Sequence, residues 1–367
     1  MQATAVRPRF NFRVGDKGPI FGLQSQADEM VKTADLVGRP LVFFLYDRHD
    51  HPQTLAILQN LREHHAEFLT RNINVVIINS HAIAENAQLA QEYDLPFRLL
   101  SLEDGKMMHY FGIGSNGIAR KAVLFRPSYR VLKTYEAIVP EQFATEVLAD
   151  IATHINVEPA RYIPMQAPVL VIPDVFDRDF CRYLMHVWQT EGNVDSGSMV
   201  QRDGKTVGVY NYDRKIRRDH FISNQNLIAQ LKAIISARVC PEIAKAFQYE
   251  VTRFEDFRII CYEAERGGYF RPHRDNTTDA TAHRRWAMSI NLNTEEYEGG
   301  YLRFPEYAPH LYRPETGCAV IFSCSILHEV TDIEQGDRFA LTSFLYGEAE
   351  ARIREEYNRK TGGDYRA

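Results

Sequence analysis

The sequence predicts two domains, an α/β domain with a mixed sheet followed by a domain of helices and many short strands. The length of 367 residues suits two domains. Strand-like apolar runs alternate with helical patterns as far as residue 155, whereas short strands between Gly and Pro turns dominate from residue 251. Three prolines within residues 159–168 predict an extended linker. The domains are therefore expected at residues 1–158 and 169–367.

Composition and charge disfavour several classes of protein. Hydrophobic residues make up 45% and charged residues 25%, as in ordinary globular chains. The 43 basic and 48 acidic residues give a net charge of −5, which argues against a nucleic-acid partner. No apolar run is long enough to span a membrane, and the first residues lack a secretory pattern. Five cysteines without CxxC spacing favour neither disulfides nor a cysteine zinc site. We expect a cytoplasmic protein without membrane or nucleic-acid partners; its oligomeric state is not predicted.

In the first domain, short β-branched and aromatic runs predict buried strands, and apolar residues spaced along one face predict helices. The last two strands are joined by the turn signal Pro127-Ser128-Tyr129. Strands are expected at residues 41–46, 73–79, 121–126 and 130–135, and helices at 55–68, 84–93 and 141–155. This order predicts an α/β sandwich.

The segments VGDKGPIFGL, GRPLVFFLYDRHDHPQT, LPFRLLSLEDGK and GIARKAVLFRPSYRVLKTYE resemble the thioredoxin fold in its peroxiredoxin branch, over residues 14–155. The resemblance implies a reactive cysteine in the loop at 47–54, yet this loop contains no sulfur. Neither Gln53 nor Thr54 can replace a thiolate in peroxide reduction. The active-site arginine of the family would fall near Lys121, a second departure. We expect an inactive domain with a structural or recruiting role.

The second domain should begin with helices. The segment DRDFCRYLMHVW predicts one helix, and a second is expected from Ser223, a plausible N-cap, to Val239. Pro241 interrupts this pattern before a short extension. From residue 251 short strands follow, which indicates a sandwich or barrel. The tail EAEARIREEYNRK predicts a solvated helix.

The segment RIICYEAERGGYFRPHRDN contains His273 and Asp275, two positions apart. Positions i and i+2 of a strand face the same side, so imidazole and carboxylate can point at one place. A third ligand is expected from His328 in CAVIFSCSILHEV. Two histidines and one carboxylate, with three octahedral positions open, are typical of non-haem Fe(II) oxygenases. Taken singly, the HxD pair could be an exposed strand, and His328 a structural histidine beside Glu329.

Arg338 follows His328 by ten residues, in DRFALTSFLY. That length suffices to end one strand, turn at residues 334–337 and begin the next. A guanidinium in an apolar strand is costly unless paired, and no acidic residue on that strand is an obvious partner. An anionic ligand bound bidentately would satisfy it. Taken alone, Arg338 could equally be a surface arginine.

With the Gly-Gly turn of GGYLRFPEY between the HxD and the distal histidine, these residues resemble the 2-oxoglutarate/Fe(II) dioxygenases, most closely the prolyl 4-hydroxylase branch, over residues 168–347. The resemblance implies a double-stranded β-helix (jelly roll) with N-terminal helices, and a reaction that uses O2, with ascorbate as a further expected cofactor. It implies that Fe(II) is held by His273, Asp275 and His328. It also implies that 2-oxoglutarate is bound by Arg338, Tyr262, Thr342 and Asn291. Tyr262 and Thr342 could instead serve packing.

The resemblance implies a hydroxylase of an unactivated C–H bond, with a prolyl or other side chain in a peptide or protein as the first expected substrate. Candidate substrate contacts are Tyr269, Arg271 and Trp286, each also explicable as barrel packing. The loop at 276–285 could line a substrate groove. A free amino acid or small metabolite is the alternative substrate. A non-catalytic interaction protein with two degenerate domains is the second alternative.

Overall fold

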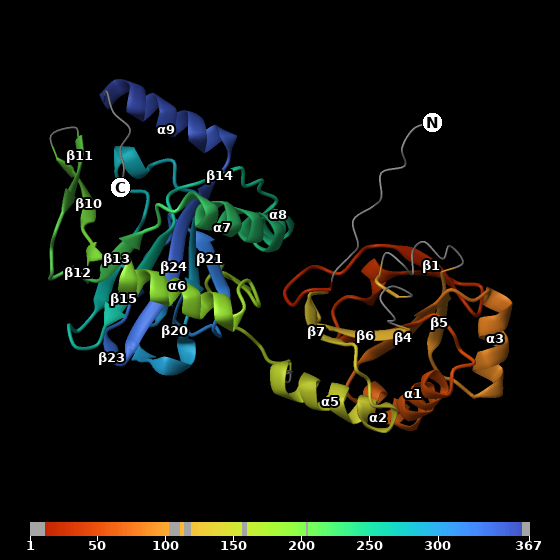
Figure 1. Ribbon diagram of the computed structural model, residues 1–367. Coiled ribbons are helices and arrows are strands. Elements are labelled where there is room, and N and C mark those ends of the chain that lie inside the picture. Colours follow the sequence, from red (N-terminus) through yellow and green to blue (C-terminus); the bar gives the residue numbers. More distant parts are fainter. Residues whose placement is uncertain (1–11, 103–110, 114–118, 156–159, 203–204, 362–367) are drawn as a thin grey trace. The chain divides into compact units, whose positions relative to one another are not determined.

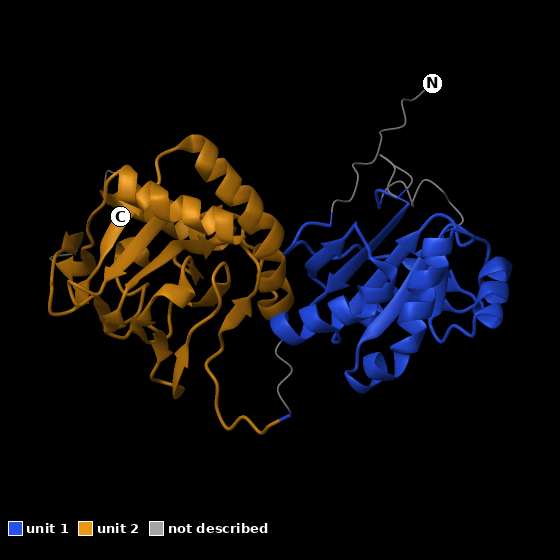
Figure 2. Ribbon diagram, turned by 60° about the horizontal axis from the view of Figure 1, so that its bottom comes forward, with its two compact units in different colours: residues 1–160 blue, residues 161–367 orange. Residues whose placement is uncertain are grey.

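The computed structural model describes residues 12–102, 111–113, 119–155, 160–202 and 205–361 (Figure 1). The chain divides into two compact units, residues 1–160 and 161–367 (Figure 2). In the proline-rich segment, residues 160–168 form neither helix nor strand, while residue 159 lies outside the described residues. Parts of two segments quoted above, 103–106 and 117–118, also lie outside them. No helix in the described part of the chain has the length and hydropathy needed to cross a membrane.

The first unit contains a seven-stranded sheet of order β2-β1-β5-β4-β3-β6-β7, in which β3, β4 and β5 are parallel and the other pairings antiparallel. The predicted mixed sheet is thus confirmed. Its strands are β1 (Gly22–Ser25), β2 (Met30–Lys32), β3 (Leu41–Tyr46), β4 (Asn74–Asn79), β5 (Arg98–Ser101), β6 (Arg120–Phe125) and β7 (Val131–Tyr135). The helices are η1 (Thr33–Leu36), α1 (Pro52–Glu63), α2 (His65–Thr70), α3 (Ile83–Glu92), η2 (Pro140–Gln142) and α5 (Phe143–His154).

Both faces of this sheet are covered, which explains why every residue of β3 is buried. Val42, Phe44 and Tyr46 belong to a core shared with α1, α2, α3 and α5. Phe43 and Leu45 belong to a second core, on the other face, that includes residues of the loops and of η1. The α-helices that the structure describes in this unit therefore pack on one face, and η1 packs on the other.

The second unit begins with helices that pack on a large sheet. They are α6 (Arg178–Thr190), α7 (Gln225–Arg238) and α8 (Cys240–Phe247), and α9 (Glu348–Thr361) ends the described chain. Asn224, rather than the predicted Ser223, is the N-cap of α7, because its Oδ1 accepts hydrogen bonds from the amides of Asn226 and Leu227 at 3.0 and 3.2 Å. Ser223 lies one residue too early for this geometry.

Two antiparallel sheets form the body of this unit (Figure 1). The larger has the order β8-β21-β17-β24-β15-β13-β9, with β14 also on β24, and the smaller has the order β12-β16-β22-β19-β20. Strands of the larger sheet are β8 (Leu170–Ile172), β9 (Val194–Asp195), β13 (Arg218–Phe221), β14 (Arg253–Phe254), β15 (Arg258–Glu263), β17 (Trp286–Asn291), β21 (Ala319–Ser323) and β24 (Asp337–Tyr346). Those of the smaller are β12 (Lys215–Ile216), β16 (Tyr269–His273), β19 (Leu302–Phe304), β20 (Ala308–Tyr312) and β22 (His328–Val330). Two further sheets have two strands each: the hairpin of β10 (Ser198–Arg202) with β11 (Lys205–Val209), and the pair of β18 (Glu298–Gly299) with β23 (Ile333–Gln335).

Successive side chains of each strand in the larger sheet point to opposite faces, so alternate residues pack in different cores. On β24, Phe339, Leu341 and Leu345 join the core formed with α6 and α7. Ala340 and Phe344 instead contact the core that includes residues of the smaller sheet. The inner face of the larger sheet, opposite the helices, is therefore where polar residues can gather around a cavity.

Candidate active site

Two neighbouring strands of the smaller sheet bring the predicted triad together. His273 on β16 lies directly opposite His328 on β22. Asp275 lies beyond the end of β16, and its amide donates a hydrogen bond of 2.9 Å to the carbonyl of Cys324. The carboxylate of Asp275 is 3.6 Å from Nε2 of His273 and 3.3 Å from Nε2 of His328. One atom from each of the three residues can therefore contact a single ion, since these atoms lie within 4.8 Å of one another.

Each imidazole is oriented by its own strand. Nδ1 of His273 lies 2.9 Å from the carbonyl of Arg271, and Nδ1 of His328 lies 3.1 Å from the carbonyl of Ile326. When Nδ1 donates to a carbonyl, Nε2 carries the lone pair, which is the arrangement common in metal-binding histidines. Both Nε2 atoms face Asp275, so the donor set fits a divalent cation.

The protonation states of His328 and Asp275 also suit metal binding. Burial lowers the pKa of His328 to about 4, so its ring is neutral at pH 7. Burial opposes ionisation of Asp275, but the adjacent His328 and His273 outweigh it and hold the pKa of that carboxyl below its usual range. A neutral imidazole and an ionised carboxylate are the forms that bind metal.

Arg338 lies in the same cavity, buried on β24 with 2% of its surface exposed. Its Nη2 donates to Oδ1 of Asn291 at 3.2 Å, and its guanidinium lies 5.5 Å from the ring centre of Tyr262. Its Nη1 is buried and has no hydrogen-bond partner among the described residues. No described carboxylate pairs with Arg338, so an anionic ligand would satisfy this guanidinium.

The cavity has a volume of about 550 Å³ and joins these groups. Tyr262, Ser289 and Thr342 line it from three adjacent strands, with Ser289 directly opposite Thr342. Asn291 does not line it, and acts instead through its hydrogen bond to Arg338. The volume is within the usual range for small-molecule sites.

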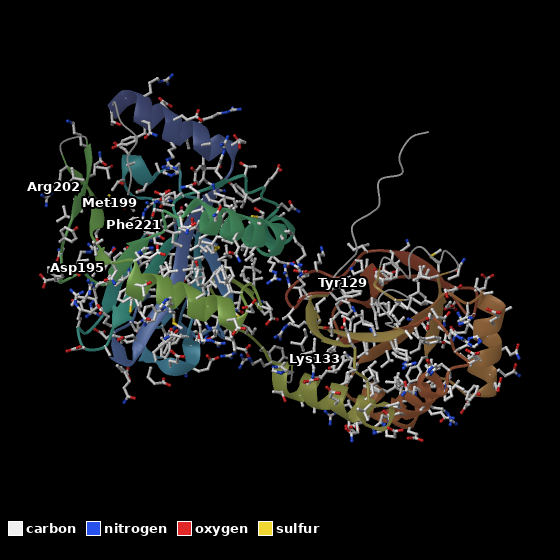
Figure 3. All side chains as sticks on the ribbon, viewed as in Figure 1. Tyr129, Lys133, Asp195, Met199, Arg202 and Phe221 are labelled. Atoms are coloured by element: carbon white, nitrogen blue, oxygen red, sulfur yellow. The ribbon has the colours of Figure 1, made fainter. Side chains whose placement is uncertain are left out.

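Two features of the cavity were missed by the sequence reasoning. The hairpin β10–β11 contributes Met199 and Arg202 to its wall, both labelled in Figure 3. Lys215 and Arg217, at the edge of the smaller sheet, also line it. The signal available in the sequence was the alternation of Lys215, Arg217 and Asp219 in KIRRDHF, which places three charges on one side of an extended segment.

The three predicted substrate contacts do not line the cavity. Trp286 packs in the helix-facing core and stacks on Phe247 at 4.4 Å, because its neighbour Ala287 occupies the inward position on β17. Arg271 forms a bidentate ion pair with Asp332 and lies over the ring of Tyr269. The hydroxyl of Tyr269 donates to the carbonyl of Tyr212. The structure thus places none of the three at the cavity, and contact of these residues with a substrate stays a prediction.

In the first unit, the loop after β3 leads directly into α1. Thr54 is buried there, and its hydroxyl has no hydrogen-bond partner among the described residues. Arg120, rather than the expected Lys121, reaches this loop, where it contacts His51 and Gln53. Lys121 points elsewhere and pairs with Glu136 at 2.8 Å. An arginine is therefore present beside the loop, although a cysteine is not.

Comparison with known families agrees with both parts of this description. Residues 257–346 match the model of the 2OG-Fe(II) oxygenase superfamily, and residues 14–134 match that of the AhpC/TSA family. The chain thus carries a thioredoxin-like domain of the peroxiredoxin type followed by a 2OG-Fe(II) oxygenase domain. Both predicted resemblances are confirmed.

Individual relatives match one part of the chain each. A putative peroxiredoxin bcp of Coxiella burnetii is 27% identical over 103 residues, which are 28% of this chain and 68% of that protein. The multifunctional procollagen lysine hydroxylase and glycosyltransferase of Caenorhabditis elegans is 25% identical over 183 residues, 47% of this chain but 24% of that protein. The crystal structure of peroxidoxin BcpB from Mycobacterium tuberculosis covers 40% of this chain and 100% of its own, with a TM-score of 0.37 and 19% identity.

Proposed function

We propose that the second unit is an Fe(II)- and 2-oxoglutarate-dependent dioxygenase that hydroxylates an unactivated C–H bond. The observation that carries this proposal is the coexistence, in one cavity, of the His273, Asp275 and His328 triad with a buried arginine that lacks an anionic partner. The match to the 2OG-Fe(II) oxygenase superfamily supports it. Either feature alone occurs in proteins of many kinds, but a metal-binding triad and an anion site together suit a chelating 2-oxo acid.

In this proposal His273, Asp275 and His328 hold Fe(II), and Arg338 binds the distal carboxylate of 2-oxoglutarate. Asn291 orients Arg338, while Tyr262 and Thr342 border the cosubstrate. When bound, the cofactors couple the oxidation of 2-oxoglutarate by O2, to succinate and CO2, with insertion of the second oxygen atom into a C–H bond; ascorbate would keep the iron reduced. The protein's part is to fix the ligands and to aim one C–H bond.

We assign the fold of this unit to the double-stranded β-helix. From β15 to β24 the strands of the two sheets alternate, with β15, β17, β21 and β24 in the larger sheet and β16, β19, β20 and β22 in the smaller, except that β19 and β20 are consecutive neighbours in the smaller sheet. This alternation, with helices covering only the larger sheet, is what a jelly roll requires. It leaves the inner faces of both sheets free to surround the cavity.

A side chain in a peptide or protein is the first substrate to test. The similarity to a procollagen lysine hydroxylase supports this class, since that relative is named for action on a side chain of a protein. A free amino acid or small metabolite would use the same cofactor site. No membrane or nucleic-acid partner is invoked.

The test of the cofactor site is an anaerobic titration of the metal-free protein with Fe(II) and 2-oxoglutarate. We expect the weak visible metal-to-ligand absorption band of a chelated 2-oxo acid. Absence of the band together with absence of iron binding would contradict the proposal and favour a non-catalytic interaction protein.

We further propose that the first unit has no peroxidase activity, because a threonine hydroxyl at position 54 cannot supply the thiolate that attacks a peroxide. The full chain should not consume hydrogen peroxide in the presence of dithiothreitol. Four of the five cysteines are buried in the second unit, and Cys240 is partly exposed. The Cys240→Ser variant is therefore the control for incidental thiol chemistry, and turnover that persists in it would contradict the proposal.

A further inference from the structure

Lys215 is a buried lysine that lines the cavity. Only 6% of the residue is exposed, and it lines the cavity beside the triad. Its Nζ donates to the carbonyl of Gly197 and lies 4.7 Å from the ring centre of Phe270. That ring stacks on His273 at 3.4 Å between centres. The ammonium is thus separated from a metal-binding histidine by one aromatic ring.

Three arginines of the cavity wall have carboxylate partners, and a fourth, Arg258, lies 4.9 Å from the ring centre of Phe221. Arg217 forms two hydrogen bonds of 2.7 Å with Asp219, and Arg284 forms bonds of 2.7 and 2.9 Å with Glu255. Arg274 likewise pairs with Glu306. These pairs compensate the cost of burying or crowding charge, so Asp219, Glu255 and Glu306 each already have an arginine partner.

Lys215 itself has no carboxylate within ion-pair distance among the described residues. Burial, and then the nearby Arg217, lower its pKa well below the usual value for lysine. A buried ammonium held by one carbonyl and one aromatic ring is poorly compensated. Of the acidic residues that line the cavity, Asp275 belongs to the triad and Asp256 is exposed.

Two further cations lie in the cavity wall. Arg202 on the hairpin β10–β11 and Arg214 before β12 are exposed there, and neither pairs with a described carboxylate. The potential of a cavity lined mainly by cations attracts anions and raises their local concentration. Since Arg338 is assigned to 2-oxoglutarate, these groups remain for the second ligand.

We infer that the substrate carries a carboxylate that pairs with Lys215 while its reacting C–H bond faces the triad. This inference rests on the proposed function and names the substrate class for that site. A single ammonium balances a single carboxylate, and the pair would relieve the uncompensated charge of Lys215. The carboxylate can belong to a free amino acid or to an acidic side chain or C-terminus of a peptide; a cationic side chain such as lysine would be repelled.

Acetate serves as a defined probe for this anion site. Protein loaded with Mn(II) and saturating 2-oxoglutarate, under nitrogen, has Arg338 and two of the three open metal positions occupied. The part of the nuclear relaxation of added acetate that depends on Lys215 therefore reports binding near the ion at the proposed anion site. We expect enhanced relaxation of acetate but not of acetamide. The enhancement should be lost in Lys215→Met and kept in Lys232→Met, a control on the exposed face of α7.

Succinate formation coupled to substrate oxidation then distinguishes the two sources of the carboxylate. It is measured with free acidic amino acids and with capped acidic peptides, and each compound is compared with its amide. The preferred class should show a KM raised about 30-fold or more in Lys215→Met. Equal relaxation of acetate and acetamide, or enhancement that survives Lys215→Met, would overturn the inference while the Fe(II) and 2-oxoglutarate band stands. Absence of that band overturns the proposed function itself.

Discussion

Replacing His328 with alanine should abolish Fe(II) binding, whereas replacing Arg338 with alanine should leave iron bound and weaken only 2-oxoglutarate. His328 supplies one of three donor atoms that lie within 4.8 Å of one another, so its loss leaves two. Arg338 contacts none of the triad and has an unpartnered Nη1. Truncating one partner of a buried charge pair costs roughly 2–5 kcal/mol, so 2-oxoglutarate affinity should fall by at least about 30-fold.

Metal content after dialysis and the visible band in an anaerobic titration measure the two effects separately. Arg253→Ala is the matched control, because Arg253 pairs with the half-exposed Glu348 and does not line the cavity. It should retain both iron and the band. Equal loss of iron in His328→Ala and Arg338→Ala would contradict the division of roles between metal and cosubstrate.

Replacing Arg284 with leucine should destabilise the second unit by about 3–5 kcal/mol, because it leaves the carboxylate of Glu255 buried without its bidentate partner. Arg284 and Glu255 are 7% and 7% exposed, and the guanidinium also lies 3.9 Å from the ring centre of Phe344. Burial opposes ionisation of Glu255, but Arg284 lowers its pKa below the usual value. The stabilisation is therefore complete above the unfolded pKa of about 4.3 and is lost as the pH falls below it.

Urea unfolding at pH 7 and at pH 3 measures this effect. Arg253→Leu removes an ion pair with Glu348 in which both side chains are about half exposed, so it should lower the free energy of unfolding much less than Arg284→Leu does. Similar losses of unfolding free energy in the two variants would contradict the view that burial determines how strongly an ion pair stabilises this unit. If Arg284→Leu lowered the free energy of unfolding as much at pH 3 as at pH 7, the predicted pH dependence of this ion pair would be wrong.

Local patterns were sufficient for the parts of the fold whose side chains alternate regularly. The apolar run of residues 41–46 coincides with β3, because both faces of that strand are covered. The HxD spacing predicts that the side chains of His273 and Asp275 point at one place, and in the structure they lie side by side. Asp275, however, lies beyond the end of the strand and is held by a backbone hydrogen bond to Cys324. His328 is predicted as the third ligand from its place in the order of motifs and from the family resemblance.

Other features depend on contacts that sequence spacing does not encode. Trp286 is predicted to contact the substrate, but Ala287 and Ser289 line the cavity, and strand alternation therefore places Trp286 on the face toward the helices. The exposure of Lys215 to the cavity follows from the pairing of a two-residue strand with β16, which no local pattern specifies. Arg120 and Lys121 are adjacent, so only their opposite directions from β6 distinguish which one reaches the loop.

The hydrogen bonds that orient the two imidazoles have a thermodynamic consequence for the whole second unit. Each Nδ1 bonds a carbonyl two residues earlier in its own chain segment, and His273 and His328 lie opposite each other only while β16 and β22 are paired, so the complete donor geometry exists only in the folded unit. A metal that binds the folded form and not the unfolded one shifts the folding equilibrium in proportion to the logarithm of its free concentration. Iron supply would therefore regulate the resistance of this unit to heat and proteases, even in the absence of turnover, through mass action alone.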